Sequence, residues 1–253
     1  MQEKEIKEAD KERYSQIVQE EQGCQCTCCG PSTLDRAEAL GYSIKDLKCI
    51  PDEAILGLGC GNPVGLAELK PGEVVLDLGS GAGIDVFLAA NKVGPQGKAI
   101  GVDMTEEMVQ KAQSLAQKHG YDNIEFRLGE IEALPIEDDS IDIIISNCVI
   151  NLAPDKSKVF REAHRVLKPG GRLVVSDIVT EGELPQSIRQ DLNAWSVCVA
   201  GAEEQQKYLQ KLETAGFTEI QVTSKKEFYF QHEDEKTLHK ILSVTVKACK
   251  SRQ

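Results

Sequence analysis

The sequence predicts an α/β fold with a mostly parallel sheet of seven strands and helices on both faces. From Pro71 onward, short runs of apolar residues alternate with segments of helical periodicity. The apolar runs are nearly continuous, which is typical of parallel strands buried on both faces. A glycine-rich turn follows the first run, as expected where an open sheet binds a ligand at the carboxyl ends of its strands.

The expected elements alternate along the chain. Strands are expected at residues 74–78, 99–102, 124–128, 141–146 and 172–176. The helices between them are expected at residues 84–93, 105–119 and 157–166. The remaining elements are helices at residues 190–199 and 203–215 and strands at residues 219–223 and 244–248. Right-handed crossovers then bring the carboxyl ends of the parallel strands to one edge of the sheet.

The chain divides into three parts. Residues 1–50 are expected to be a cysteine-rich extension, with a frayed helix or arm followed by a short helix that Ser32 or Thr33 caps. Residues 51–180 form the ligand-binding core and begin with a glycine-rich loop. Residues 181–253 supply the last helices and strands.

Composition and charge exclude several classes of function. Lys and Arg number 29 against 41 Asp and Glu, and the resulting net charge of −12 disfavours nucleic acid as a partner. No apolar run is long enough to span a membrane, and the charged amino-terminal segment is unlike a signal peptide, so a cytoplasmic protein is expected. The nine cysteines, an odd number, argue against a complete disulfide framework and favour catalytic or metal-binding thiols.

The strongest local motif is the segment DLGSGAG that begins at Asp77. Its glycines, Gly79, Gly81 and Gly83, let the backbone turn tightly and approach a ligand closely. Asp103, at the end of the next expected strand, is placed to bind ribose hydroxyls. Dinucleotide-binding domains share both features. The GxGxG spacing, together with an aspartate that would pair with an ammonium group and repel a pyrophosphate, favours S-adenosylmethionine.

With the segment VLKPGG at residues 166–171, this motif resembles the Rossmann-like class I methyltransferases. Met104 and Ile131 would then pack on the adenine, with Glu130 near its exocyclic amine, although core packing is an equal alternative for the two apolar residues. The cofactor-binding residues that the resemblance implies are Asp77, Gly79, Gly81, Gly83, Asp103, Met104, Glu130, Ile131 and Asn147.

Three cysteines far apart in the sequence fall in segments expected at the same edge of the sheet. Cys60 lies in the loop before the first strand, Cys148 follows the fourth strand, and Cys198 follows the fifth. Thiolates select soft ions, and the four histidines show no zinc-site spacing, so a soft metalloid is favoured over zinc. Taken singly, each cysteine could instead be a small buried apolar residue.

Three segments around these cysteines, LGCGNP, SNCVINL and CVAGA, resemble the arsenite methyltransferases in order and separation. The resemblance implies an enzyme of arsenic detoxification that binds As(III) through Cys60, Cys148 and Cys198 and methylates arsenite or methylarsenite, with a lid around the third cysteine. It also implies a disulfide formed during turnover by a further cysteine, either Cys28 or Cys29. A thiol reductant, glutathione or thioredoxin, would reduce that disulfide.

Two alternatives remain at the level of the sequence. The ordinary methyltransferase core also suits a C- or O-methyltransferase that acts on a small organic molecule. The dense cluster of cysteines at positions 24–29 would suit a protein that sequesters or senses a metalloid, but such a protein would not need an intact cofactor loop.

Overall fold

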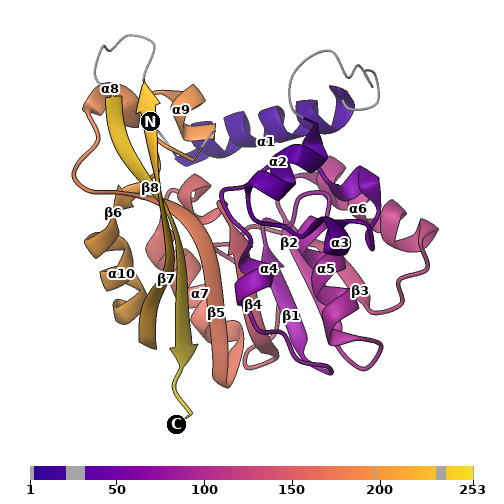
Figure 1. Cartoon of the computed structure of the whole chain (residues 1–253). Coiled ribbons are helices and arrows are strands. Elements are labelled where there is room, and N and C mark those ends of the chain that lie inside the picture. The colour runs from indigo at the N-terminus through magenta and orange to yellow at the C-terminus, as the bar shows by residue number, and fades with distance from the viewer. Residues whose placement is uncertain (1–2, 21–31, 197, 232–237, 253) are drawn as a thin grey trace.

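A computed structural model describes residues 3–20, 32–196, 198–231 and 238–252. Its centre is an eight-stranded sheet in the order β3-β2-β1-β4-β5-β8-β7, with the short β6 paired to β5 outside this path (Figure 1). The strands are β1 Val74–Leu78, β2 Lys98–Asp103, β3 Ile124–Leu128, β4 Ile141–Asn147, β5 Leu167–Thr180, β6 Glu203–Glu204, β7 Phe217–Gln231 and β8 Leu238–Lys250. Only the β5–β8 and β7–β8 pairs are antiparallel among these strands.

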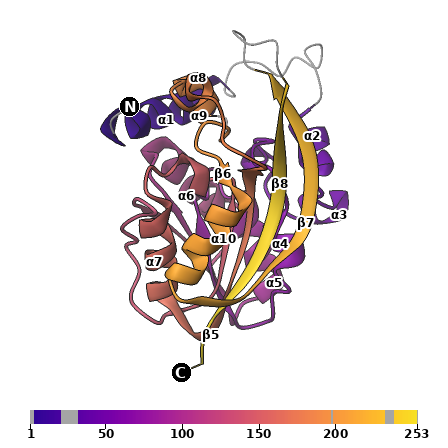
Figure 2. The ribbon, with the colours of Figure 1, turned by 90° about the vertical axis from the view of Figure 1, so that its left-hand side faces the viewer.

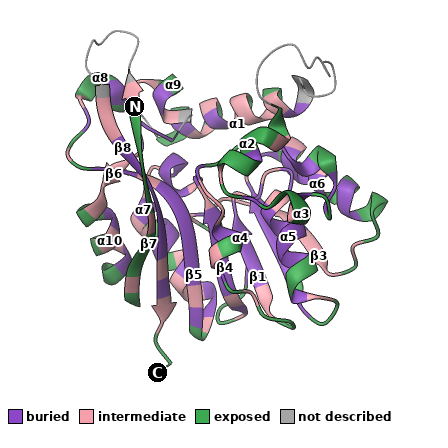
Figure 3. Cartoon of the chain, viewed as in Figure 1, coloured by how far each residue is buried: buried purple, intermediate pink, exposed green. Residues whose placement is uncertain are grey.

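Helices cover both faces of the sheet (Figure 2). Successive residues of a strand enter opposite cores. In β4, Ile144 shares a core with residues of α7 (Lys156–Val166) and α10 (Gln205–Thr214), whereas Ile143 and Ile145 share the other core with residues of α5 (Ile84–Val93) and α6 (Glu106–Lys118). The central strands are therefore buried along most of their length (Figure 3). The helices are α1 Glu3–Glu20, α2 Thr33–Ala39, α3 Ile44–Leu47, η1 Asp52–Ala54, α4 Pro63–Leu66, α5 Ile84–Val93, α6 Glu106–Lys118, η2 Ile150–Leu152, α7 Lys156–Val166, α8 Gln186–Arg189, α9 Leu192–Ser196 and α10 Gln205–Thr214.

The predicted α/β class and the seven expected strands are confirmed, with differences in length. β7 and β8 extend well beyond the expected segments, and the expected helix at 203–215 begins with the two residues of β6. The helix expected at 190–199 is reduced to α9, because the chain turns at Cys198, whose φ is +65°. Ser32 caps α2 with a reciprocal hydrogen bond to Asp35, as in a capping box.

Of the frayed helix or arm expected at the amino terminus, the described part is a helix, but the expectation of fraying is wrong because the helix packs against the rest of the protein. α1 is an 18-residue helix that lies across the carboxyl edge of the sheet, against α6 and α9 (Figure 1). Ile6 and Val18, at its two ends, are buried. Of the helices that the structure describes, none combines the length and apolar character needed to cross a bilayer.

Candidate active site

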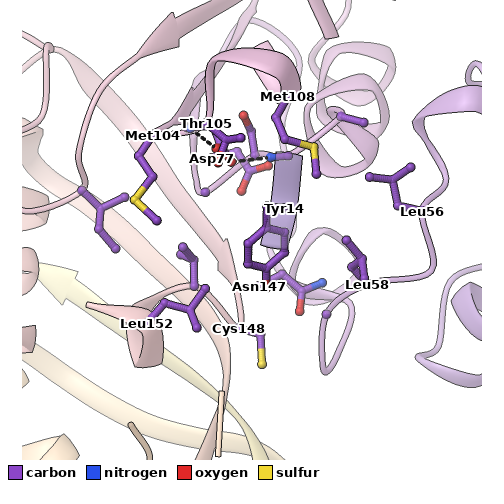
Figure 4. A pocket seen from close by; sticks show the side chains of 18 of the residues that line it. Tyr14, Leu56, Leu58, Asp77, Met104, Thr105, Met108, Asn147, Cys148 and Leu152 are labelled. Carbon is purple, nitrogen blue, oxygen red and sulfur yellow. Dashed lines mark hydrogen bonds between the residues drawn. The ribbon is translucent and has the colours of Figure 1, made fainter. Parts of the chain in front are cut away.

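A cavity of about 330 Å³ lies at the carboxyl ends of β1, β2 and β4, beneath α1. Its volume falls within the range of about 300–1,000 Å³ that is usual for small-molecule sites. The cofactor loop lines one part of it, and Cys148 and Cys198 line another. Figure 4 shows Tyr14 of α1 projecting into the cavity between Asp77 and Cys148. The cavity therefore brings the cofactor loop and two of the three predicted cysteines together around one space.

The glycine loop leaves open space for a ligand. Gly79, Gly81 and Gly83 all have positive φ, so the turn needs residues without a Cβ atom. A Cβ atom built on Gly81 would meet only the Met108 sulfur, at 3.9 Å, so this part of the cradle is free of protein atoms.

Asp77 and Asp103 are two buried carboxylates at the floor of this cradle. Asp77 is 3% exposed, and among the described residues none donates a hydrogen bond to its side chain. Burial, followed by the charges of Asp85 and Asp103, raises the pKa of Asp77 well above its usual value. Asp103 accepts hydrogen bonds from the backbone N–H groups of Gly81 and Thr105, both at 2.8 Å. A ligand that brings an ammonium group to Asp77 and hydroxyls to Asp103 fits this arrangement, as S-adenosylmethionine would.

The residues predicted around the adenine divide into two groups. Met104 and Ile131 line the cavity. Glu130 does not belong to the lining, and its carboxylate accepts a hydrogen bond from Lys7 of α1 at 2.8 Å. Its neighbour Glu132 lies in the lining instead, also paired with Lys7, at 2.9 Å. This pairing could not be predicted from the sequence because it depends on where α1 packs.

The three predicted cysteines come together in one buried cluster with Leu152. The Cys60 thiol donates to the carbonyl of Ser176 at 3.3 Å, and the Cys198 thiol donates to the carbonyl of Cys148 at 3.0 Å. Cys148 and Cys198 have φ values of +67° and +65°, a conformation that side chains other than glycine rarely adopt. Two of the three sulfurs are thus held by a strained backbone, which is common at functional sites.

The pKa of each of the three thiols lies above its usual value, which favours the protonated form at neutral pH. Burial raises the pKa of Cys60. The contact with Cys148 and then burial raise the pKa of Cys198 well above its usual value. For Cys148, the contact with Cys198 lowers the pKa, but the contact with Cys60, burial and the nearby charges outweigh it and raise the pKa well above its usual value. The described cysteines are all free thiols.

Sequence reasoning missed two residues of this site. The first, Asp177, has a carboxylate oxygen within 4.8 Å of the sulfurs of Cys60 and Cys148. It lies one residue beyond the expected end of the fifth strand, and burial raises its pKa to about 7. The second, Tyr14, lies on α1, whose sequence shows no apolar stripe. Cys28 and Cys29 lie outside the described residues.

Comparison with known proteins places the chain in a family. The sequence model of the methyltransferase domain matches residues 69–216. An arsenite methyltransferase of Halobacterium salinarum is 46% identical over 88% of this chain, which spans 60% of that protein. The human arsenite methyltransferase is 44% identical over 51% of this chain, which spans 36% of it. The crystal structure of an arsenic(III) S-adenosylmethionine methyltransferase from Chlamydomonas reinhardtii matches with a TM-score of 0.68 and 34% identity, over 88% of this chain and 75% of that one. The chain thus belongs to the arsenic(III) S-adenosylmethionine methyltransferase family.

Proposed function

We propose that this chain transfers the methyl group of S-adenosylmethionine to trivalent arsenic bound by Cys60, Cys148 and Cys198. The observation that carries the proposal is the meeting of three thiols from three distant segments, two of which, Cys148 and Cys198, line the cavity beside the cofactor loop. An organic acceptor would need a general base but no such cluster. Arsenite methyltransferases among the relatives of the chain support the same conclusion.

The binding of arsenous acid to the three thiols needs no general base. Arsenous acid releases its three hydroxyl groups as water when three protonated thiols bind, so no net proton is gained or lost. Three-coordinate arsenic keeps one lone pair. The methyl donor supplies an electrophilic carbon on a sulfonium, and the lone pair forms the new bond to this carbon while the carbon–sulfur bond breaks. The contribution of the chain is to position the sulfurs and exclude water around them.

Turnover also needs two electrons, because forming the arsenic–carbon bond raises the formal oxidation state of arsenic by two. We propose that two thiols supply these electrons by forming one disulfide, in which Cys28 or Cys29 takes part. Glutathione or a thioredoxin would then reduce the disulfide. This proposal includes a cytoplasmic setting, where reduced thiols persist.

The test measures labelled methyl transfer from S-adenosylmethionine with and without arsenite, in the presence of glutathione. Product should form only with arsenite. Cys148→Ser and Cys198→Ser should each lower turnover about a hundredfold or more. Loss of a residue that only orients a ligating side chain already lowers activity by about 10- to 100-fold, and loss of the ligating side chain itself should cost at least as much. Cys49→Ser is the matched control, because Cys49 is exposed and outside the cavity, and it should keep full turnover. Transfer to an organic acceptor without arsenite, or full turnover of Cys148→Ser, would remove the proposal.

A further inference from the structure

Asn147 fastens the loop that carries Cys60. Its side-chain oxygen accepts hydrogen bonds from the backbone N–H groups of Cys60 at 2.9 Å and Gly61 at 3.3 Å. Its side-chain nitrogen donates to the carbonyl of Gly61 at 2.8 Å. Because Asn147 directly precedes Cys148, these bonds fix the Cys60 loop relative to the second thiol.

The contact between Asn147 and this loop leaves no free space. A Cβ atom built on Gly59 would lie 2.8 Å from the Asn147 side chain. The amide also fits in one orientation only, because turning it over would place its NH₂ group against two N–H donors and its oxygen against a carbonyl. Asn147 is therefore a structural clamp rather than a group that turns freely toward a ligand.

The same amide reaches the cofactor end of the cavity. Its nitrogen also donates to the Tyr42 hydroxyl at 2.9 Å, and that hydroxyl donates to the carboxylate of Asp85, with oxygens at 2.9 and 3.0 Å. Tyr42 is 3% and Asp85 2% exposed. Asp85 lies in the first turn of α5 and lines the same cavity as Asp77. A continuous series of buried and partly buried hydrogen bonds thus joins the floor of the cofactor pocket to Cys60.

We propose that Asp85, Tyr42 and Asn147 are a positioning relay through which a bound cofactor holds Cys60 in place for arsenic. This inference rests on the proposed function. Asp77 and Asp85 are buried carboxyl groups that line the same cavity and repel one another when both are ionised. A cationic ammonium group bound near Asp77 would offset this repulsion. Asp85 could then accept the Tyr42 hydrogen bond as a full carboxylate, and charge-assisted bonds are the stronger ones. The bonds that continue through Asn147 would tighten with it.

The relay predicts that cofactor and arsenite bind cooperatively, each raising the affinity for the other by the same factor. Trp195, the single tryptophan, reports on arsenite because it packs against the cysteine cluster. Its fluorescence would be titrated with arsenite with and without saturating S-adenosylhomocysteine, which carries the ammonium group but cannot donate a methyl group. The arsenite affinity of the unmodified chain should rise at least about fivefold when S-adenosylhomocysteine is bound.

Tyr42→Phe keeps the ring and removes the hydroxyl that makes the shorter connection between Asp85 and Asn147, leaving only their direct hydrogen bond at 3.5 Å. The variant should still bind S-adenosylhomocysteine and arsenite separately, but the factor that links the two affinities should fall towards one. Tyr121→Phe is the matched control, since its hydroxyl donates to the Cys49 carbonyl at 3.3 Å, away from the cavity. It should keep the full factor. Asn147→Asp removes the two N–H donors of the side-chain amide but keeps an oxygen that accepts from the Cys60 N–H. This variant tests the same connection if Tyr42→Phe does not fold. Its factor between the two affinities should fall in the same way.

The outcomes separate this inference from the proposed function. Independent binding in the unmodified chain, or an unchanged factor in Tyr42→Phe or Asn147→Asp, would overturn the relay while leaving arsenic methylation intact. Arsenite binding that is equally tight in Cys198→Ser would instead overturn the three-thiol site itself.

Discussion

Asp10 should make the docking of α1 depend on pH. The residue is 1% exposed, and one of its carboxylate oxygens is buried without a hydrogen-bond partner among the described residues. Burial, partly opposed by Arg13, raises the pKa of Asp10 from 3.8 to about 7. The docked state of α1 favours the protonated form of Asp10. The free-energy cost that ionisation of Asp10 adds to docking is therefore absent below about pH 4, grows as the pH rises, and is complete above about pH 7.

The size of this effect follows from the two pKa values. At about 1.4 kcal/mol for each pH unit, the difference between 3.8 and about 7 amounts to about 4 kcal/mol at most, of which about 2.5 kcal/mol falls between pH 5 and pH 8. Asp10→Asn removes the titration. Protection factors from hydrogen exchange, measured over α1, should therefore fall as much as roughly eightyfold from pH 5 to pH 8 in the unmodified chain and hardly at all in the variant.

Glu12→Gln supplies the control, since it makes the same chemical change on the exposed face of the same helix. Its protection factors should follow those of the unmodified chain. Parallel loss of protection in Asp10→Asn and the unmodified chain would refute the assignment of the pH dependence to this carboxyl.

Two further predictions concern single positions near the thiols. Gly59→Ala should lower methyl transfer at least about tenfold, because the new methyl group would lie 2.8 Å from the Asn147 side chain. The control Gly72→Ala, also at positive φ but with open space around it, should lower the free energy of unfolding by only about 1 kcal/mol and keep activity. Equal activity of the two variants in the labelled-methyl assay would contradict the prediction. Tyr208→Phe removes a hydroxyl that donates to Asp177 at 3.1 Å. Urea unfolding should show that the variant loses about 1.5–3 kcal/mol of its free energy of unfolding at pH 8, where Asp177 is ionised, and less at pH 5. Equal losses at the two pH values would contradict the role of the charge.

The sequence was sufficient to predict the meeting of the three cysteines, because parallel strands joined by helices must end at one edge of the sheet. Cys60, Cys148 and Cys198 all belong to segments at that edge. Their positive φ angles could not be predicted, since αL conformations in residues other than glycine depend on tertiary contacts. Asn147, expected at the cofactor, lines the cavity, but its hydrogen bonds to the Cys60 loop required the folded geometry.

Elements stabilised by their partners were the hardest to predict. β7 continues through the polar run at residues 223–227 and the exposed Phe228 and Tyr229 to Gln231, because pairing with β8 rather than burial holds it in place. α1 has only scattered apolar residues, and its contacts with the cavity through Tyr14 depend on side chains from elsewhere in the chain. Neither pattern has the periodicity from which an amphipathic helix or a half-buried strand is predicted.

In the proposed three-thiol site, the separation of the three sulfurs along the chain would give the substrate a mechanical role. Cys148 and Cys198 alone are 50 residues apart in the sequence. An arsenic atom bound by all three thiols would therefore cross-link distant elements of the chain, as a disulfide does. Arsenic would then stiffen the protein that modifies it. Each methyl group added leaves one fewer sulfur attached to a trivalent product, so successive products would loosen the fold and ease their own departure.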